Sequence, residues 1–157
     1  MYRSSIASKE LGIISGVPGR DRPLPIVRPA FPDLNEFASE FADALEAGQV
    51  TNNGPHVRSF EAELSAYLGV PTLVFSSGQS ALMVLLASCL PRGGEVIVPS
   101  YTFCATPHAV VWAGARPVFA DIDPVTLTID VEDVERKITA ETVAILGVCS
   151  YGIPCDY

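Results

Sequence analysis

The pattern of apolar positions changes along the chain, and its first part predicts helices. Residues 34–47 carry phenylalanine and leucine at helical spacing. Asp33 precedes them and fits a helix N-cap, while Gly48 ends the pattern. A second helix is predicted between the polar loop at 51–55 and Gly69. Its apolar face consists of Val57, Phe60, Leu64, Tyr67 and Leu68.

From residue 72 onward, short apolar runs alternate with helical patterns. Such runs are typical of strands buried on both faces, because neither side of the strand is polar. Alternating strands and helices predict an α/β fold with three layers, in which a mostly parallel sheet lies between helices. Strands are expected at 72–75, 95–98, 117–120 and 142–148, and helices at 79–90, 107–112 and 131–138.

Two of these helices carry more detailed expectations. In the helix at 79–90 the inward face is expected to hold Leu82, Leu85, Leu86 and Cys89. The helix at 107–112 begins with Pro107, and Thr106 before it fits an N-cap. Residues 1–24 are poorly patterned and are expected to form a flexible arm.

Composition and charge narrow the classes of function. The chain has 157 residues, 48% of them hydrophobic, and a formal net charge of -8 with no run of Lys or Arg. Nucleic acids and anionic membranes are recognised by clustered basic residues, so neither is an expected partner. No apolar run is long enough to span a bilayer and no secretory signal is recognisable, so we expect a cytoplasmic protein.

The four cysteines show no metal-ligand spacing, and three of them lie inside apolar segments. They are Cys89, Cys104, Cys149 and Cys155. We expect buried free thiols in a reducing compartment. The two histidines also lack ligand spacing, so no metal site is predicted.

Candidate chemistry is expected at the carboxyl ends of the strands, where open parallel sheets bind ligands. The four segments there are 76–79, 100–103, 121–123 and 149–152. Ser77, Gly78 and Gln79 follow the first predicted strand and begin a helix. The free N–H groups of that helix start suit a phosphate, although a plain turn that needs glycine explains the same residues. After the next strand, Tyr101 or Phe103 could stack on a flat heteroaromatic ring, or both could pack beneath a loop.

A pair of carboxylates follows the third predicted strand. Asp121 and Asp123 are two residues apart, so both would face one side of a continuing strand. A metal or acid–base role is one interpretation. The start of a turn at Asp123-Pro124 is the other, and we favour it.

Taken in order, these segments resemble the DegT-type sugar aminotransferases, a branch of the fold-type-I enzymes that use pyridoxal 5'-phosphate (PLP). The resemblance runs from about Leu24 to Tyr157. It implies that residues 25–157 form the N-terminal part of an incomplete PLP-binding large domain. The segments that carry it are 24–29, 50–55, 60–61, 67–70, 77–82, 95–106, 114–123 and 151–156.

The resemblance implies particular cofactor contacts. Gly78 and Gln79 would bind the PLP phosphate through their backbone N–H groups, with Ser77 beside them, and Phe103 would stack on the pyridine ring. The family usually has Thr or Ser where Gln79 stands, so a hydroxyl contact to the phosphate is missing here. Backbone contacts need no particular side chain, so the phosphate site is still expected.

The resemblance also implies a substrate side. Thr51 and Asn53 would lie next to the substrate, in the active site of the partner subunit of a homodimer. The implied substrate is a nucleotide-linked keto-sugar in amino-sugar and polysaccharide biosynthesis, with glutamate as amino donor. The family usually has His where Cys149 stands, which leaves the role of that position open.

One part of the family's chemistry is missing from these residues. The family's Schiff-base lysine would fall beyond position 157, so the chain is expected to be a fragment that is inactive alone and holds no catalytic residue. Its lysines, Lys9 and Lys137, are expected to be solvated charges. Two alternatives stay open: a non-catalytic remnant that binds PLP or a sugar nucleotide or pairs with a longer relative, and a PLP-dependent sugar dehydratase with the lysine replaced.

Overall fold

The computed structural model describes residues 28–157, so the arm predicted at 1–24 lies outside the described residues. The chain divides after Val50 into two compact units. Helix α2, Leu34–Glu46, belongs to the first unit, and the Asp33 carboxylate accepts a hydrogen bond from the Asn35 N–H at 2.9 Å. The predicted helix and its cap are therefore confirmed. None of the residues of α2 is buried.

The second unit begins with the predicted helix α3, Pro55–Leu68, which Gly69 ends in a left-handed conformation at φ 72°. The strand predicted at 72–75 is wrong, because these residues pair with no strand among residues 28–157. Their N–H groups go to α3 instead. Thr72 donates to Ser65 Oγ and Val74 to Glu61 Oε1, both at 2.9 Å.

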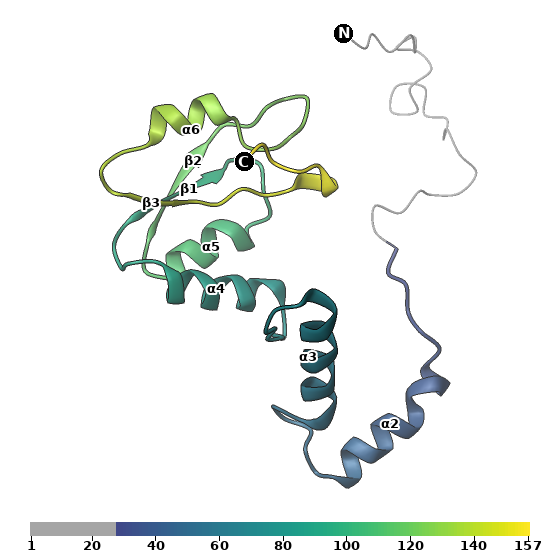
Figure 1. Cartoon of the computed structure of the whole chain (residues 1–157). Helices are drawn as coiled ribbons and strands as arrows, with labels where there is room; N and C mark the ends of the chain where they lie inside the picture. The colour runs from purple at the N-terminus through teal and green to yellow at the C-terminus, as the bar shows by residue number, and fades with distance from the viewer. Residues whose placement is uncertain (1–27) are drawn as a thin grey trace, which may run out of the picture. The chain divides into compact units, whose positions relative to one another are not determined.

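The three other predicted strands form one parallel sheet in the order β2-β1-β3 (Figure 1). The strands are β1, Glu95–Pro99; β2, Arg116–Ala120; and β3, Thr142–Ile145. The last is three residues shorter than predicted. After Leu146, whose N–H still donates to the Ile97 carbonyl at 2.8 Å, the chain leaves the sheet.

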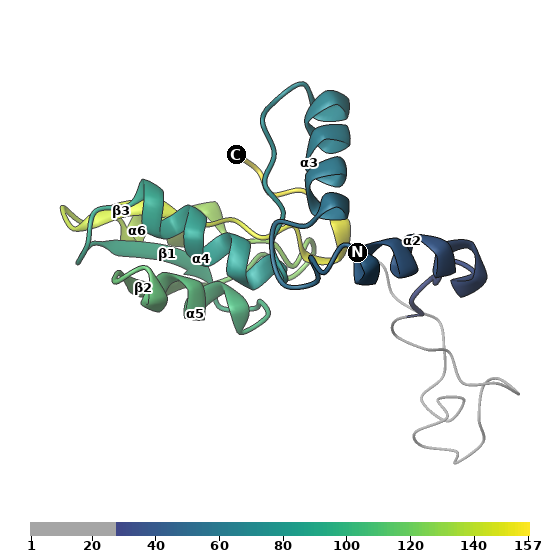
Figure 2. The same ribbon diagram turned by 90° about the horizontal axis from the view of Figure 1, so that it is seen from below.

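Helices cover both faces of this sheet, which confirms the predicted three-layer α/β fold. Helices α4, Gly78–Cys89, and α5, Ala105–Trp112, lie on one face, and α6, Val131–Lys137, lies on the other (Figures 1 and 2). Helix α5 starts two residues before the predicted boundary, and Cys104 rather than Thr106 is its N-cap. Pro107 fits the first turn because an N–H there has no acceptor within the helix.

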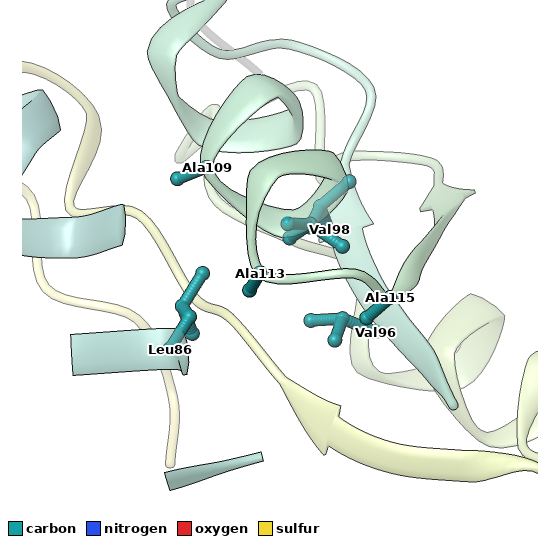
Figure 3. Close-up of a cluster of buried hydrophobic side chains, with 7 residues drawn as sticks. Leu86, Val96, Val98, Ala109, Ala113 and Ala115 are labelled. Carbon is teal, nitrogen blue, oxygen red and sulfur yellow. The ribbon is translucent and has the colours of Figure 1, made fainter. Parts of the chain in front are cut away.

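The core follows the alternation of side chains along β1, which is buried over its whole length. Val96 and Val98 point toward Leu86 of α4 and toward α5 (Figure 3), while Ile97 packs on the opposite side toward α6. Leu86 is buried as predicted, but Leu85 is 56% exposed and Cys89 is also exposed. Helix α4 is apolar on nearly every side, so its sequence alone does not select the face that is covered.

The expectation of four buried thiols is wrong for three of them. Cys155 is buried, but Cys89, Cys104 and Cys149 are exposed. Cys104 is the N-cap of α5, and Cys149 follows β3. Both therefore lie in connecting segments outside the apolar strands. None of the helices within residues 28–157 combines the length and apolar character needed to cross a membrane.

Candidate functional site

The candidate site lies at the edge of the sheet toward which β1 points. Three segments reach this edge: the start of α4, the loop at 100–104, and the short 3-10 helix η2, Ser150–Gly152 (Figure 1). Parallel strands end at a common edge, so segments far apart in sequence meet there. The segments that follow β1 and β3 therefore lie at the same edge as the start of α4.

The start of α4 presents free backbone donors. Ser77 is the N-cap, and its Oγ accepts from the Ser80 N–H at 3.1 Å and contacts Ser80 Oγ at 2.9 Å. The N–H groups of Gly78 and Gln79 have no acceptor among the described residues, as is normal for the first helical positions. Apart from its chain neighbours and the backbone of α4, no heavy atom of the described residues lies within 4 Å of the point where a Cβ of Gly78 would stand. The helix start is thus open to an anion.

An aromatic cavity of about 430 Å³ lies at the same edge. Its walls are Tyr101, Thr102, Phe103, Val148, Cys149, Ser150 and Tyr151. The hydroxyls of Tyr101 and Tyr151 are 2.6 Å apart, and this hydrogen bond raises the pKa of Tyr101. Phe103 is 76% exposed, so one face of its ring is free for a flat partner.

A hydroxyl pair supports the loop that carries Phe103. Thr102 Oγ1 lies 2.8 Å from Oγ1 of the buried Thr106, and the Thr106 N–H donates to the Phe103 carbonyl at 3.0 Å. The hydroxyl predicted as a helix cap therefore holds the loop in place. Sequence reasoning placed residues 149–152 among the candidate ligand-binding segments, but it did not single out Tyr151 as a wall of the cavity.

Thr51 and Asn53 do not line this cavity. Both lie in the loop before α3, where Thr51 Oγ1 is 3.1 Å from Asn52 Oδ1 and Arg58 donates to the Asn53 carbonyl. Asn53 adopts a positive φ of 47°, a conformation that asparagine tolerates. The structure therefore brings Phe103 to the cavity and leaves the two predicted substrate-adjacent residues outside its walls.

The carboxylates after β2 act within the fold. Asp123 Oδ1 accepts from the N–H groups of Val125 at 2.7 Å and Thr126 at 2.9 Å, and these bonds, that from Thr126 first, lower the pKa of Asp123. This is the turn that the sequence favoured. Across residues 28–157, no group of three or more His, Cys, Asp or Glu side chains is placed to hold a metal ion.

Most of the chain matches a family of known proteins. Residues 33–157 match the DegT/DnrJ/EryC1/StrS aminotransferase family. The dTDP-4-amino-4,6-dideoxy-D-glucose transaminase of Escherichia coli is 35% identical over 136 residues, which are 87% of this chain and 37% of that protein. The chain thus spans a little over a third of the length of this relative.

Solved structures of similar fold include DesI and a dehydratase. The crystal structure of DesI in the presence of its TDP-sugar product has 40% identity and a TM-score of 0.73, over 95% of this chain and 38% of DesI. The E. coli GDP-4-keto-6-deoxy-D-mannose-3-dehydratase with bound hydrated PLP has 29% identity and a TM-score of 0.64, over 78% of this chain and 33% of that one.

Proposed function

Because the chain belongs to the DegT/DnrJ/EryC1/StrS aminotransferase family, we propose that its second unit forms part of the cofactor site of a PLP-dependent aminotransferase acting on nucleotide-linked keto-sugars. The observation that carries this proposal is a pair of free N–H groups at the start of α4, at the same sheet edge as the exposed ring of Phe103. The activity proposed is that of the whole protein, to which this chain contributes cofactor contacts.

The start of α4 fits the phosphate group of PLP. The N–H groups of Gly78 and Gln79 point out of the helix, and the helix dipole adds partial positive charge at the same place. Ser77 keeps its hydroxyl on Ser80, so it orders the turn. The Gln79 side chain brings no hydroxyl, so in this proposal the backbone carries the phosphate contact.

Phe103 is proposed to stack on the pyridine ring. Its loop is held by the Thr102–Thr106 hydroxyl pair, which limits the orientations that the ring can take. When bound, PLP supplies an electron sink that allows an amino group to pass between a donor and a keto-sugar. The described residues bind, orient and cover one face of such a ring.

No lysine of this chain is proposed as a catalyst. Lys137 lies on α6, and its amine pairs with the Asp133 carboxylate, so it is a structural partner and not the freely solvated charge that was expected. Lys9 lies outside the described residues. This chain is therefore proposed to supply contacts to the cofactor and not the lysine that transfers protons.

Several finer points belong to the same proposal. Glutamate is proposed as amino donor, a homodimer as the assembled form, and the cytoplasm as the location. Thr51 and Asn53 are proposed to contact the substrate from the partner subunit. Their support is the family resemblance of segment 50–55 and, for the location, four cysteines that are free of disulfides.

A dehydratase acting on a similar sugar is the second candidate, because one structural relative of this chain is such an enzyme with PLP. The two reactions differ in the fate of nitrogen. With ¹⁵N-glutamate and a nucleotide-linked keto-sugar, the whole protein is expected to give a sugar product that retains ¹⁵N. A deoxygenated ketone without ¹⁵N would favour the dehydratase.

The phosphate contact is tested with pyridoxamine 5'-phosphate, which forms no imine with lysine and so reports non-covalent binding. Gly78→Pro removes one N–H, while proline fits the first helical position after the extended Ser77. We expect affinity to fall about tenfold, the typical effect of one hydrogen bond to a charged group. Gly78→Ala is the matched control, because it keeps the N–H and has open space for its methyl group.

Two comparisons complete the test. Pyridoxamine without phosphate is expected to bind the wild-type chain and Gly78→Pro equally weakly. Phe103→Leu is expected to weaken pyridoxamine 5'-phosphate binding by about two- to tenfold, because a stacking contact is lost. Equal affinity of wild type and Gly78→Pro for the phosphate form, or no binding by wild type, would remove the phosphate proposal.

A further inference from the structure

After β3 the chain makes a sharp reversal that brings two cysteines together. It passes Cys149, turns through η2 and returns to Cys155 six positions later. Tyr151 and Gly152 both adopt positive φ, at 54° and 83°, which produces the reversal. A positive φ is uncommon for a tyrosine, and it puts the two thiols next to each other.

Tyr157 and Cys155 surround the Cys149 sulfur. The Tyr157 hydroxyl lies 3.7 Å from Cys149 Sγ, and the backbone N–H and the thiol of Cys155 face the same sulfur. Together these donors lower the pKa of Cys149, with the Cys155 N–H as the largest cause. A thiol with several donors around its sulfur reaches the reactive thiolate state more readily.

The two cysteines differ in their surroundings. Cys149 is exposed and lines the aromatic cavity, whereas Cys155 is buried against Ile97 in the α6-side core. Gly147 makes room for the buried sulfur, since a Cβ at that position would lie 3.1 Å from Cys155 Sγ. An exposed thiol beside a buried one gives an attacking sulfur and a protected second sulfur.

We propose that Cys149 and Cys155 form a redox-reactive dithiol that hydrogen peroxide oxidises to an intramolecular disulfide. The Cys149 thiolate attacks one peroxide oxygen, the O–O bond breaks, and hydroxide leaves with a proton as water. Cys155, as thiolate, then attacks the sulfur of the Cys149 sulfenic acid, and the S–O bond breaks to release a second water. In sum, two thiols and one peroxide give one disulfide and two waters.

The disulfide would connect the candidate site to the core. Cys149 shares the cavity wall with Phe103 and Tyr151, and Cys155 belongs to the apolar cluster on the α6 face of the sheet. Oxidation would therefore restrain the reversal that carries Tyr151. This inference is independent of the proposed function, because the dithiol chemistry needs neither PLP nor a sugar.

Peptide mass spectrometry tests the proposal on the full chain. Protein treated with one equivalent of hydrogen peroxide is blocked with N-ethylmaleimide and digested with trypsin. The peptide after Lys137 contains both Cys149 and Cys155, while Cys89 and Cys104 fall in two other peptides. We expect the first peptide to lose two hydrogens and remain unblocked, at least ten times faster than the other two cysteines react.

Variants assign the two roles. In Cys155→Ser, oxidation is expected to stop at a Cys149 sulfenic acid that dimedone traps. In Cys149→Ser the rapid reaction is expected to disappear, and in the matched control Cys104→Ser it is expected to be unchanged. The proposal is wrong if, after peroxide treatment, N-ethylmaleimide modifies Cys149 and Cys155 of wild type as completely as it modifies Cys89 and Cys104. It is also wrong if Cys149 or Cys155 forms a disulfide with Cys89 or Cys104 instead.

Discussion

The two faces of the sheet are held by different kinds of contact. On the α4 and α5 side a larger apolar cluster fills the space, as Figure 3 shows. It consists of Leu86, Val96, Val98, Ala109, Val110, Ala113 and Ala115. On the α6 side the cluster is smaller, and Ile145, which pairs with Ile97 of that cluster, is still 51% exposed.

Polar contacts supplement the thinner α6 side. The Asp133 carboxylate accepts from the Asp121 N–H at 2.7 Å and pairs with Arg136 at 3.0 Å and with Lys137. These bonds fix α6 to the end of β2. One face therefore depends on the volume of its side chains, while the other also depends on the charge of one carboxylate, so the two faces should respond to different perturbations.

The largest effect is expected from removing volume on the α4 and α5 side. Leu86→Ala should lower the free energy of unfolding by about 2–5 kcal/mol, because it leaves a cavity in a packed cluster. Leu85→Ala on the same helix is the matched control, since Leu85 is 56% exposed, and it should cost less than about 1 kcal/mol. Urea unfolding followed by circular dichroism measures both, and equal costs would mean that α4 does not pack as described.

A smaller effect is expected from adding volume where β1 meets β3. Val143 is the extra residue opposite the step between Glu95 and Val96, and its side chain occupies the space beside Gly94. Gly94→Ala would overlap that side chain and should cost about 1–3 kcal/mol. The double variant Gly94→Ala/Val143→Ala should recover part of the loss in the same unfolding assay, and a purely additive result would contradict the contact.

The smallest effect, limited to acid, is expected at Asp133. Its hydrogen bond from Lys137, followed by that from Asp121, lowers its pKa from the ordinary 3.8 to about 2. The folded-state pKa is the lower one, so the carboxylate stabilises the fold above about pH 4 and loses that contribution as the pH falls toward 2. Asp133→Asn should reduce the change of the unfolding midpoint with pH between pH 4 and pH 2.

The exposed Glu132 on the same helix supplies the control for that measurement. Glu132→Gln should leave the slope of the midpoint against pH as it is in wild type, because its carboxylate has no comparable partners among the described residues. An unchanged slope in Asp133→Asn would show that other carboxylates govern acid unfolding. The two faces of the sheet would then not differ in the way inferred here.

Local signals made much of the fold predictable. Asp33 caps a helix and Gly69 ends one as expected, because each acts on backbone groups within a few residues of itself. The strands β1 and β2 were found within one residue, since both are continuous apolar runs. The start of α4 at Gly78 was likewise readable from the turn that precedes it.

The misplaced strand and the exposed side chains of α4 have one origin. A strand exists only if another strand lies beside it, and residues 72–75 give their N–H groups to α3 in the described part of the chain. Helix α4 is apolar almost all round, so neighbours and not periodicity select its buried face. The aromatic cavity also depends on contacts between distant segments, because Tyr101 and Tyr151 are fifty positions apart.

The amino-acid sequence by itself determined the ends of α2 and α3, the strands β1 and β2 and the layered α/β class, because these depend mainly on neighbouring residues. Only the tertiary structure decided that Tyr151 joins Phe103 in one cavity and that Cys149 lies beside Cys155. Both follow from the reversal after β3, where backbone conformation sets which side chains meet, and no periodicity in the sequence records it.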